Sequence, residues 1–466
     1  MLVIIINIDV LNIINIICRS GVFMKRERFL KSTLILICSN LITSIFAFVF
    51  SIILSRNLGA EGMGLYGLIM PVYDLFICLI TGGMVTAISR VAAVYFGRDD
   101  FNNLNRSIDI SLTFNSLLAT FVVCMIFINA PYISANIIKD TRSIHALQVM
   151  CPAIFFIALS SILKGYFYGI SEMKIPAFID ISEKFLRIVI ITLLINSFSL
   201  KDVNGTVTAA YITLTLGEFI SFTVLYVMYK IKKRRFGFNF SNTEDKLQLL
   251  FNILVISFPL CINGFLSTSL SAISALIVPR RLVASGIEYN AALGMIGRFN
   301  GMAMNIIFFP TTIITSMSIV LIPDLSEKMS KKDYWAIERR ISQIVKIALF
   351  LGVLTMIICI SLSDYLGELF YRRYDLEDYI KFTALSAPII FVSMSTFGIL
   401  NGIGKQKVIL RNSLISSVMD VILVYFLTGI PSINVYGCGI SLMITSLTTL
   451  ALNMHELIKD NFYGSP

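Results

Sequence analysis

The feature that most constrains this chain is a succession of apolar runs, each about 20 residues long. A helix of that length crosses the hydrocarbon core of a bilayer. Windows of about 19 residues predict about twelve such spans, so we expect an all-α integral membrane protein. The predicted spans are Thr33–Leu54, Leu65–Ile88, Ile108–Ile128, Ala146–Phe167, Phe178–Phe198, Val207–Tyr229, Leu249–Val278, Leu293–Ile322, Ile341–Leu362, Ile380–Ile403, Val408–Leu427 and Val435–Leu457.

Composition excludes several classes of protein. Only 14% of the residues are charged, against about 25% in soluble domains. The net charge of +10 does not indicate a nucleic-acid partner, because the charges lie in short clusters between apolar runs. The eight cysteines are scattered and the two histidines, His145 and His455, are far apart, so we expect no metal and no cofactor. A membrane enzyme would usually show a paired acidic motif in a loop of useful length, whereas the longest inside loops here are basic and short, so we do not expect an enzyme.

The basic residues predict the orientation in the membrane. They concentrate in alternate loops, including Lys25–Arg28, Lys230–Arg235 and Lys328–Arg340. The positive-inside rule places these loops in the cytoplasm. With an even number of spans, both termini are expected on the cytoplasmic side of the cell membrane, and the acidic loop around Asp364 and Asp378 is expected outside.

The first 23 residues fit this scheme poorly. The stretch Met1–Cys18 is apolar but contains an aspartate and three asparagines, and it has no small-residue cleavage site. Met24 is followed at once by the basic cluster Lys25-Arg26-Glu27-Arg28. We therefore expect Met24 to be the initiator and residues 1–23 to be a non-native or unassigned extension. The alternative is a thirteenth hydrophobic segment.

Similar segments in the two halves of the chain predict an internal repeat, and the alternative is chance similarity between apolar segments. The segment Tyr168–Lys174 parallels Asn401–Lys407, and each lies at a cytoplasmic turn between two spans. Two groups of six spans would enter the membrane the same way round, as parallel repeats about an axis along the membrane normal. We therefore predict two six-helix lobes, residues 24–229 and 247–466, joined by a basic cytoplasmic linker at 230–246. Two such lobes could enclose a central cavity and rock against each other.

Two of the predicted spans are longer than a bilayer requires. The seventh contains Pro259 and the eighth contains Pro310. Proline removes a backbone hydrogen bond, so each of these spans has room for a break.

Several motifs resemble a known family. The segment Ser55–Tyr66 resembles the opening of polysaccharide exporters and flippases. Four further segments resemble the stage V sporulation protein B family of the MOP superfamily, which also contains lipid II flippases and multidrug (MATE) antiporters. These segments are Ile277–Gly286, Gly297–Ala303, Phe309-Pro310 and Leu321–Glu327. Members of the family often carry two further C-terminal helices, whereas this chain stops soon after its twelfth predicted span.

The resemblance implies a MATE/MOP-like fold and a transport function. The implied activity is alternating-access flipping of a lipid-linked saccharide, a peptidoglycan precursor on undecaprenyl pyrophosphate, across the cytoplasmic membrane for spore cortex synthesis. It also implies a cell-wall polymerase that uses the flipped precursor as a protein partner. The alternative is a cation-coupled multidrug (MATE-type) antiporter. That activity would favour an acidic, aromatic cavity, whereas the most distinctive intramembrane charges here are arginines.

Three arginines are candidates for binding a pyrophosphate. The planar guanidinium can donate two parallel hydrogen bonds to phosphate oxygens. In lipid II flippases, basic residues of the first, second and eighth helices line the cavity. By position, Arg56 and Arg298 match best, with Arg90 third. For Arg56 and Arg90 the alternative is snorkelling to the interface.

The fifth predicted span carries Asp180, Glu183 and Arg187 on one helical face, given their spacings of three and four. One interpretation is that these residues form a polar wall of the cavity, with Arg187 as a cavity cation. The alternative is that Glu183 and Arg187 form an ion pair and neutralise each other.

Lone acids inside spans are candidates for coupling transport to a proton or a sodium ion. They are Asp74, which follows Pro71 by three residues, Glu218 and Asp420. Charges within a span are costly, so each is a functional hypothesis. We take Asp74, Glu183 and Glu218 as the candidate coupling residues.

Overall fold

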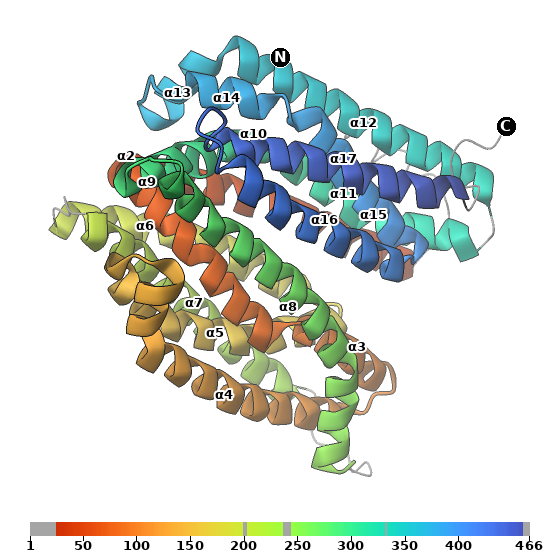
Figure 1. The fold of residues 1–466 in the computed structure, drawn as a ribbon. Coiled ribbons are helices and arrows are strands. Elements are labelled where there is room, and N and C mark those ends of the chain that lie inside the picture. The colour runs from red at the N-terminus through yellow and green to blue at the C-terminus, as the bar shows by residue number, and fades with distance from the viewer. Residues whose placement is uncertain (1–24, 199–202, 236–243, 331–332, 460–466) are drawn as a thin grey trace.

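The computed structural model describes residues 25–198, 203–235, 244–330 and 333–459. The predicted extension at 1–23 lies outside these ranges, as do residues 236–243 of the predicted linker. Within them, every regular element is helical (Figure 1). The elements are α2 (Lys25–Thr81), α3 (Met84–Gly97), α4 (Phe101–Tyr132), η1 (Ile133–Ile138), η2 (Thr141–Ser143), α5 (Ile144–Gly169), α6 (Lys174–Phe198), α7 (Val203–Arg235), α8 (Lys246–Ala284), α9 (Tyr289–Ile296), η3 (Gly297–Ala303), α10 (Met304–Phe308), α11 (Thr311–Ser330), α12 (Tyr334–Ser361), α13 (Ser363–Tyr371), α14 (Glu377–Ala384), α15 (Ala387–Ile403), α16 (Gln406–Leu427) and α17 (Tyr436–Lys459).

The helices are long and apolar enough to form a multi-span membrane protein. Eight described segments could each cross a bilayer, and ten could if each of two bent pairs forms one span. The first of them, Leu34–Gly97, has 64 residues, enough for the first and second predicted spans together. It kinks at Gly59, whose φ of 66° and ψ of −171° are not helical. Helix α6, the fifth predicted span, falls outside this count because it carries a cluster of charges.

Of the two breaks expected at prolines, the structure contains one. The eighth predicted span bends by 54° between Phe308 and Thr311, at Pro310, as expected. The expected break at Pro259 is wrong, because α8 continues through it. Neighbouring helices α2, α3 and α16 pack along α8, and such packing can hold a proline-containing helix together. The tenth predicted span contains an unexpected bend of 47° between α14 and α15.

Packing arranges the helices in two groups (Figure 1). Helices α3 to α7 pack on one another and on α2, while α9 to α17 form the second group. Helix α8 contacts both groups, through α3 and α4 on one side and α16 on the other. Helix α2 likewise contacts α6 and α7 as well as α9, η3 and α11. The domain boundaries at 229/230 and 246/247 stay predictions.

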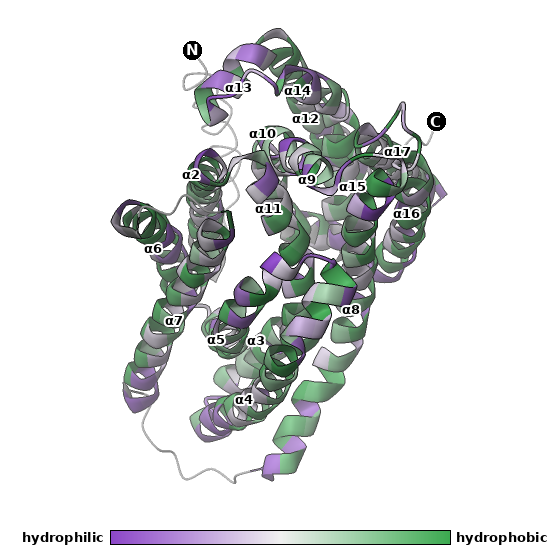
Figure 2. Cartoon of the chain, turned by 60° about the vertical axis from the view of Figure 1, so that its left-hand side comes forward, coloured by the Kyte–Doolittle hydropathy of each residue, from purple (hydrophilic) through white to green (hydrophobic). Residues whose placement is uncertain are grey.

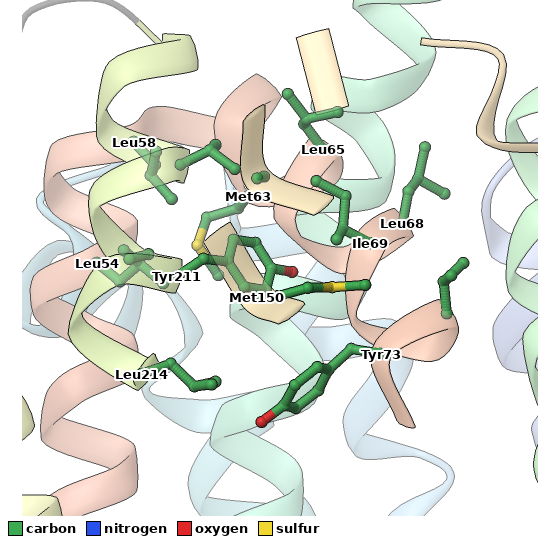
Figure 3. Close-up of a cluster of buried hydrophobic side chains, with 14 of the residues drawn as sticks. Leu54, Leu58, Met63, Leu65, Leu68, Ile69, Tyr73, Met150, Tyr211 and Leu214 are labelled. Carbon is green, nitrogen blue, oxygen red and sulfur yellow. The ribbon is translucent and has the colours of Figure 1, made fainter. Parts of the chain in front are cut away.

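Among the described residues, buried apolar side chains of α2–α7 and of α9–α17 share a cluster at one end of the bundle. We call this the α13 end, and the opposite end, where α3 is followed by α4, the α3 end. At the α13 end one large cluster combines residues of α2, α4, α5 and α7 with residues of η3, α10, α12 and α15. Figure 3 shows its centre, where Leu54, Leu58 and Met63 of α2 lie near Met150 and Tyr211.

At the α3 end the apolar side chains form two separate clusters. One joins α3, α4, α5 and α7 with the start of α8, including Tyr166 and Leu249. The other joins α11, α12, α15 and α17, including Leu325 and Ile341. Among the described residues the two groups therefore share an apolar core at the α13 end and have their own cores at the α3 end.

The outer faces of the bundle are apolar. Hydrophobic residues predominate along the helices, and hydrophilic residues are more frequent toward the ends of several of them (Figure 2). On α4, for example, Leu117, Phe121 and Ile128 are 69%, 68% and 75% exposed. Water would not solvate so continuous an apolar surface, whereas lipid does.

Candidate functional site

The two helix groups meet at the α13 end through the first candidate arginine. The Nε of Arg56 donates to the carbonyl of Phe370 at 2.7 Å, and its Nη2 donates to the carbonyl of Leu369 at 2.6 Å. These carbonyls belong to the last turn of α13, where the helix dipole is negative. Arg56 is exposed at this junction and ties α2 to α13.

A second polar contact joins the groups beside η2. The hydroxyl of Tyr289, at the start of α9, donates to Asp140 at 3.2 Å. Arg142 pairs with Asp140 at 2.7 Å and with Glu61 at 2.6 Å. Its Nη2 also approaches the amide oxygen of Asn290 at 3.5 Å. None of these contacts was predicted from the sequence; the charges close together at Lys139, Asp140 and Arg142, between two predicted spans, could have indicated them.

Backbone contact between the groups at this end requires glycine. A Cβ on Gly64 of α2 would lie 2.8 Å from the carbonyl carbon of Leu293 and 3.1 Å from its Cα. A Cβ on Gly297 of η3 would lie 2.9 Å from the amide nitrogen of Gly64. Neither neighbour is a flexible side-chain end, so α2 and the α9–η3 segment approach as closely as their backbones allow.

Arg298 lies on η3 and is paired. Its Nη1 donates to Asp375 at 2.8 Å, and its Cζ is 5.6 Å from the centre of the Tyr379 ring. Arg373 also donates to Asp375, from Nε and from Nη2, at 2.7 Å each. The Arg373 hydrogen bonds, followed by that of Arg298, hold the pKa of Asp375 well below its usual range. The Nε of Arg298 is buried without a partner, so this guanidinium retains a free donor.

Arg90 is the least engaged of the predicted cations. It is exposed on α3 and makes no hydrogen bond or ion pair with the residues that the structure describes. Arg90 lies toward the α3 end, whereas Arg56 and Arg298 lie toward the α13 end. The structure therefore does not gather the predicted cations into one cluster.

Arg187 belongs to a buried charge network. It pairs with Glu183 on its own helix, as one reading of the spacing predicts, and with Glu218 of α7 at 2.6 Å. Lys184 lies 3.1 Å from the second oxygen of Glu183. A Cβ on Gly217 would lie 2.8 Å from Glu183, so a glycine makes room for the network. Arg187 thus already has two carboxylate partners.

The same helix face carries a further pair. Asp180 of α6 contacts Lys164 of α5 at 2.7 Å. Together with the network, three basic and three acidic side chains of α5, α6 and α7 compensate one another. Mutual compensation is what makes intramembrane charges tolerable.

The lone acids have different surroundings. Asp74 is exposed on α2 and makes no hydrogen bond or ion pair with the described residues. Asp420 of α16 accepts hydrogen bonds from Ser274 of α8 at 2.7 Å and Ser441 of α17 at 2.6 Å. No basic side chain forms an ion pair with it among the described residues. Asp420 is therefore an uncompensated carboxylate held by hydroxyls of two other helices.

The predicted internal repeat relates Asp420 to Arg187. The register that aligns Lys174 with Lys407 also aligns these two, because each lies 13 residues further on (187 − 174 = 420 − 407). One group of helices thus carries a neutralised arginine where the other carries a carboxylate bound only by hydroxyls.

Comparison with known proteins agrees with this architecture. The polysaccharide biosynthesis protein family matches residues 29–329, and the MatE family matches residues 259–426. Stage V sporulation protein B of Bacillus subtilis (strain 168) is 26% identical over 90% of this chain and 82% of its own length. The lipid II flippase MurJ of the same organism is 21% identical over 93% of this chain and 82% of its own length.

A solved structure shares the fold. An inward-facing multidrug resistance MATE family transporter of the MOP superfamily superposes with a TM-score of 0.73, at 15% identity, over 92% of this chain and 98% of that one. Together with the family match, the two relatives and the apolar helices show that the chain is a multi-pass membrane transporter and not an enzyme. Because the first family match spans more than half of its residues, the chain belongs to the polysaccharide biosynthesis protein family.

Proposed function

We propose that this transporter flips a lipid-linked saccharide across the cytoplasmic membrane by alternating access. The cargo is a peptidoglycan precursor on undecaprenyl pyrophosphate, and the process served is spore cortex synthesis. Two of the relatives bear names from sporulation and lipid II flipping, which supports this choice of cargo and process.

The observation that carries the proposal is the unequal packing of the two ends. The helix groups share one apolar cluster at the α13 end and have separate clusters at the α3 end. With the N-terminus in the cytoplasm, as the basic loops predict, the α13 end is external. The conformation is then closed outside, and the two groups are free to separate on the cytoplasmic side, where the precursor is made.

The candidate arginines suit a pyrophosphate cargo. Arg90 has an uncommitted guanidinium, and Arg298 keeps a buried donor while bound to Asp375. A cargo phosphate could engage either arginine, one toward each end of the bundle, without first breaking a fully satisfied network. Arg187 is less available because two glutamates already bind it.

Coupling to a proton or sodium ion would use the uncompensated acids. Asp74 and Asp420 have no cationic partner among the described residues, whereas Glu183 and Glu218 are both bound to Arg187. We therefore place Asp74 and Asp420 ahead of the two glutamates as coupling residues.

Substitution of Arg298 in cells that depend on this protein tests the role of the cavity cation. We expect R298A to reduce heat-resistant spores at unchanged protein level, and R298K to restore only part of the loss, because lysine keeps the charge without the planar fork. R339A, at the opposite end of α12 from α13, is the matched control. Normal cortex and resistance in R298A would refute the assigned role.

A second candidate is a cation-coupled multidrug antiporter, which the MatE match over residues 259–426 favours. It predicts efflux of organic cations from vesicles in exchange for a proton or a sodium ion. Such efflux without flipping of a lipid-linked saccharide would select this candidate.

A further inference from the structure

A small cavity lies where α2 meets the end of α13. Its volume is about 480 Å³, and its lining residues are Arg56, Glu368, Leu369, Arg372 and Tyr374. This volume falls within the range of about 300–1,000 Å³ typical of small-ligand sites. One arginine comes from α2 and the other follows α13, so the cavity spans the junction between the two helix groups.

Both arginines keep donors for a ligand. The bonds of Arg56 to the α13 carbonyls use Nε and Nη2, which leaves Nη1 without a partner among the described residues. The side chain of Arg372 forms no hydrogen bond or ion pair with any described residue. Its neighbour Arg373, in contrast, is committed to Asp375 through two hydrogen bonds.

Arg372 has an unusual backbone conformation. Its φ of 54° lies in the left-handed region, where a side chain is strained and glycine is favoured. Its amide donates to the carbonyl of Glu368 at 2.9 Å and so ends α13. A left-handed residue commonly ends a helix, so this conformation belongs to the end of α13 and fixes the position of Arg372 at the cavity.

The charge of the cavity favours an anion. Two guanidiniums face one carboxylate, Glu368, whose Oε1 already accepts the hydroxyl of Tyr374 at 2.7 Å. Two arginine forks match the oxygens of a phosphate group, which accepts paired hydrogen bonds.

We propose that Arg56 and Arg372 bind a phosphate group at this junction and that its occupancy holds the α13 end closed. A ligand that contacts both helix groups binds the closed arrangement and not the separated one. By linkage it raises the ratio of closed to open states by a factor of one plus its concentration over its dissociation constant. The site goes beyond the flipping of cargo, because it requires no transport. A lipid headgroup and a free anion would both supply such a phosphate.

Binding of inorganic pyrophosphate to the full chain in phosphatidylcholine nanodiscs, measured by calorimetry, tests the proposal. We expect a site whose affinity R372A weakens tenfold or more, given the strength of charge-assisted hydrogen bonds. E368Q should tighten binding several-fold, because it removes the one opposing charge. R339A, which removes an arginine far from the cavity, should bind as the wild type does.

Equal pyrophosphate affinity in R372A and wild type would overturn the proposal, as would weaker binding in E368Q. The opposite signs expected for these two variants separate the proposal from simple misfolding. A second arm, in nanodiscs that contain phosphatidic acid, assigns the source of the phosphate. Weaker pyrophosphate binding there, in wild type but not in E368Q/R372A, identifies a lipid headgroup, and unchanged binding identifies a free anion. Success or failure here does not depend on which cargo is transported.

Discussion

Gly64→Ala should disrupt closure of the α13 end. The added methyl group would lie 2.8 Å from the carbonyl carbon of Leu293, which belongs to the other helix group and cannot rotate away. Overpacking of this kind costs about 1–3 kcal/mol. Because the strain exists only while the groups are in contact, the ratio of closed to open states should fall by about 5–150-fold. Gly67→Ala is the matched control, because nothing lies within 4 Å of its Cβ.

Distances between two spin labels, measured by double electron–electron resonance, can report this change in the ratio of closed to open states. Spin labels would replace Tyr132 of α4 and Tyr365 of α13, which are 63% and 59% exposed, in a chain whose native cysteines have been substituted. We expect G64A to add a longer distance to the distribution and G67A to leave it unchanged. If the two variants give the same distribution, the close approach of α2 to α9 does not control closure.

Three further predictions address the charges. E218Q removes one of the two carboxylates bound to Arg187 and should lower the free energy of unfolding by about 3–5 kcal/mol. R187Q/E218Q should lower it by less, because Glu183 keeps Lys184 as its partner. Thermal unfolding of the two variants in detergent compares them. The pKa of Asp375 is lowered, so its carboxylate stabilises the fold above its unfolded pKa of about 3.9 and loses this effect as the pH falls through the folded value. The stability difference between wild type and D375N should therefore be constant from about pH 8 to 5 and shrink only below about pH 4; shrinkage near neutrality would contradict the pairing. D420N should abolish the dependence of transport on a sodium or proton gradient in vesicles, and an unaltered dependence would exclude Asp420 as the coupling residue.

The spans could be predicted because bilayer thickness imposes a length on every apolar run. The ninth predicted span, Ile341–Leu362, lies within α12 except for its last residue. The helix begins earlier, at Tyr334, because hydropathy marks the lipid-facing part of a helix and not its hydrogen-bonded ends. The effect of a proline on a span could be predicted in one case of two. Pro310 separates two helices, whereas α8 continues through Pro259 with neighbouring helices packed along it.

In the candidate site, too, contacts set by local spacing could be predicted from the sequence, and contacts set by tertiary packing could not. The pair of Glu183 and Arg187 follows from local helical spacing and could be predicted. Glu218 as the second partner of Arg187 depends on how α6 packs against α7, which no local pattern reveals. Asp375 is 77 residues from Arg298, and their contact arises only after the chain bends between α12 and α14. The uncommitted state of Arg372 likewise depends on where its neighbours point.

Translocation of a labelled lipid-linked saccharide in vesicles tests the central claim most directly. The purified chain should accelerate movement of the undecaprenyl-pyrophosphate-linked precursor between leaflets over protein-free vesicles, and R298A should reduce that acceleration at equal protein incorporation. A rate equal to that of protein-free vesicles, from a chain that remains folded, would contradict a flippase function.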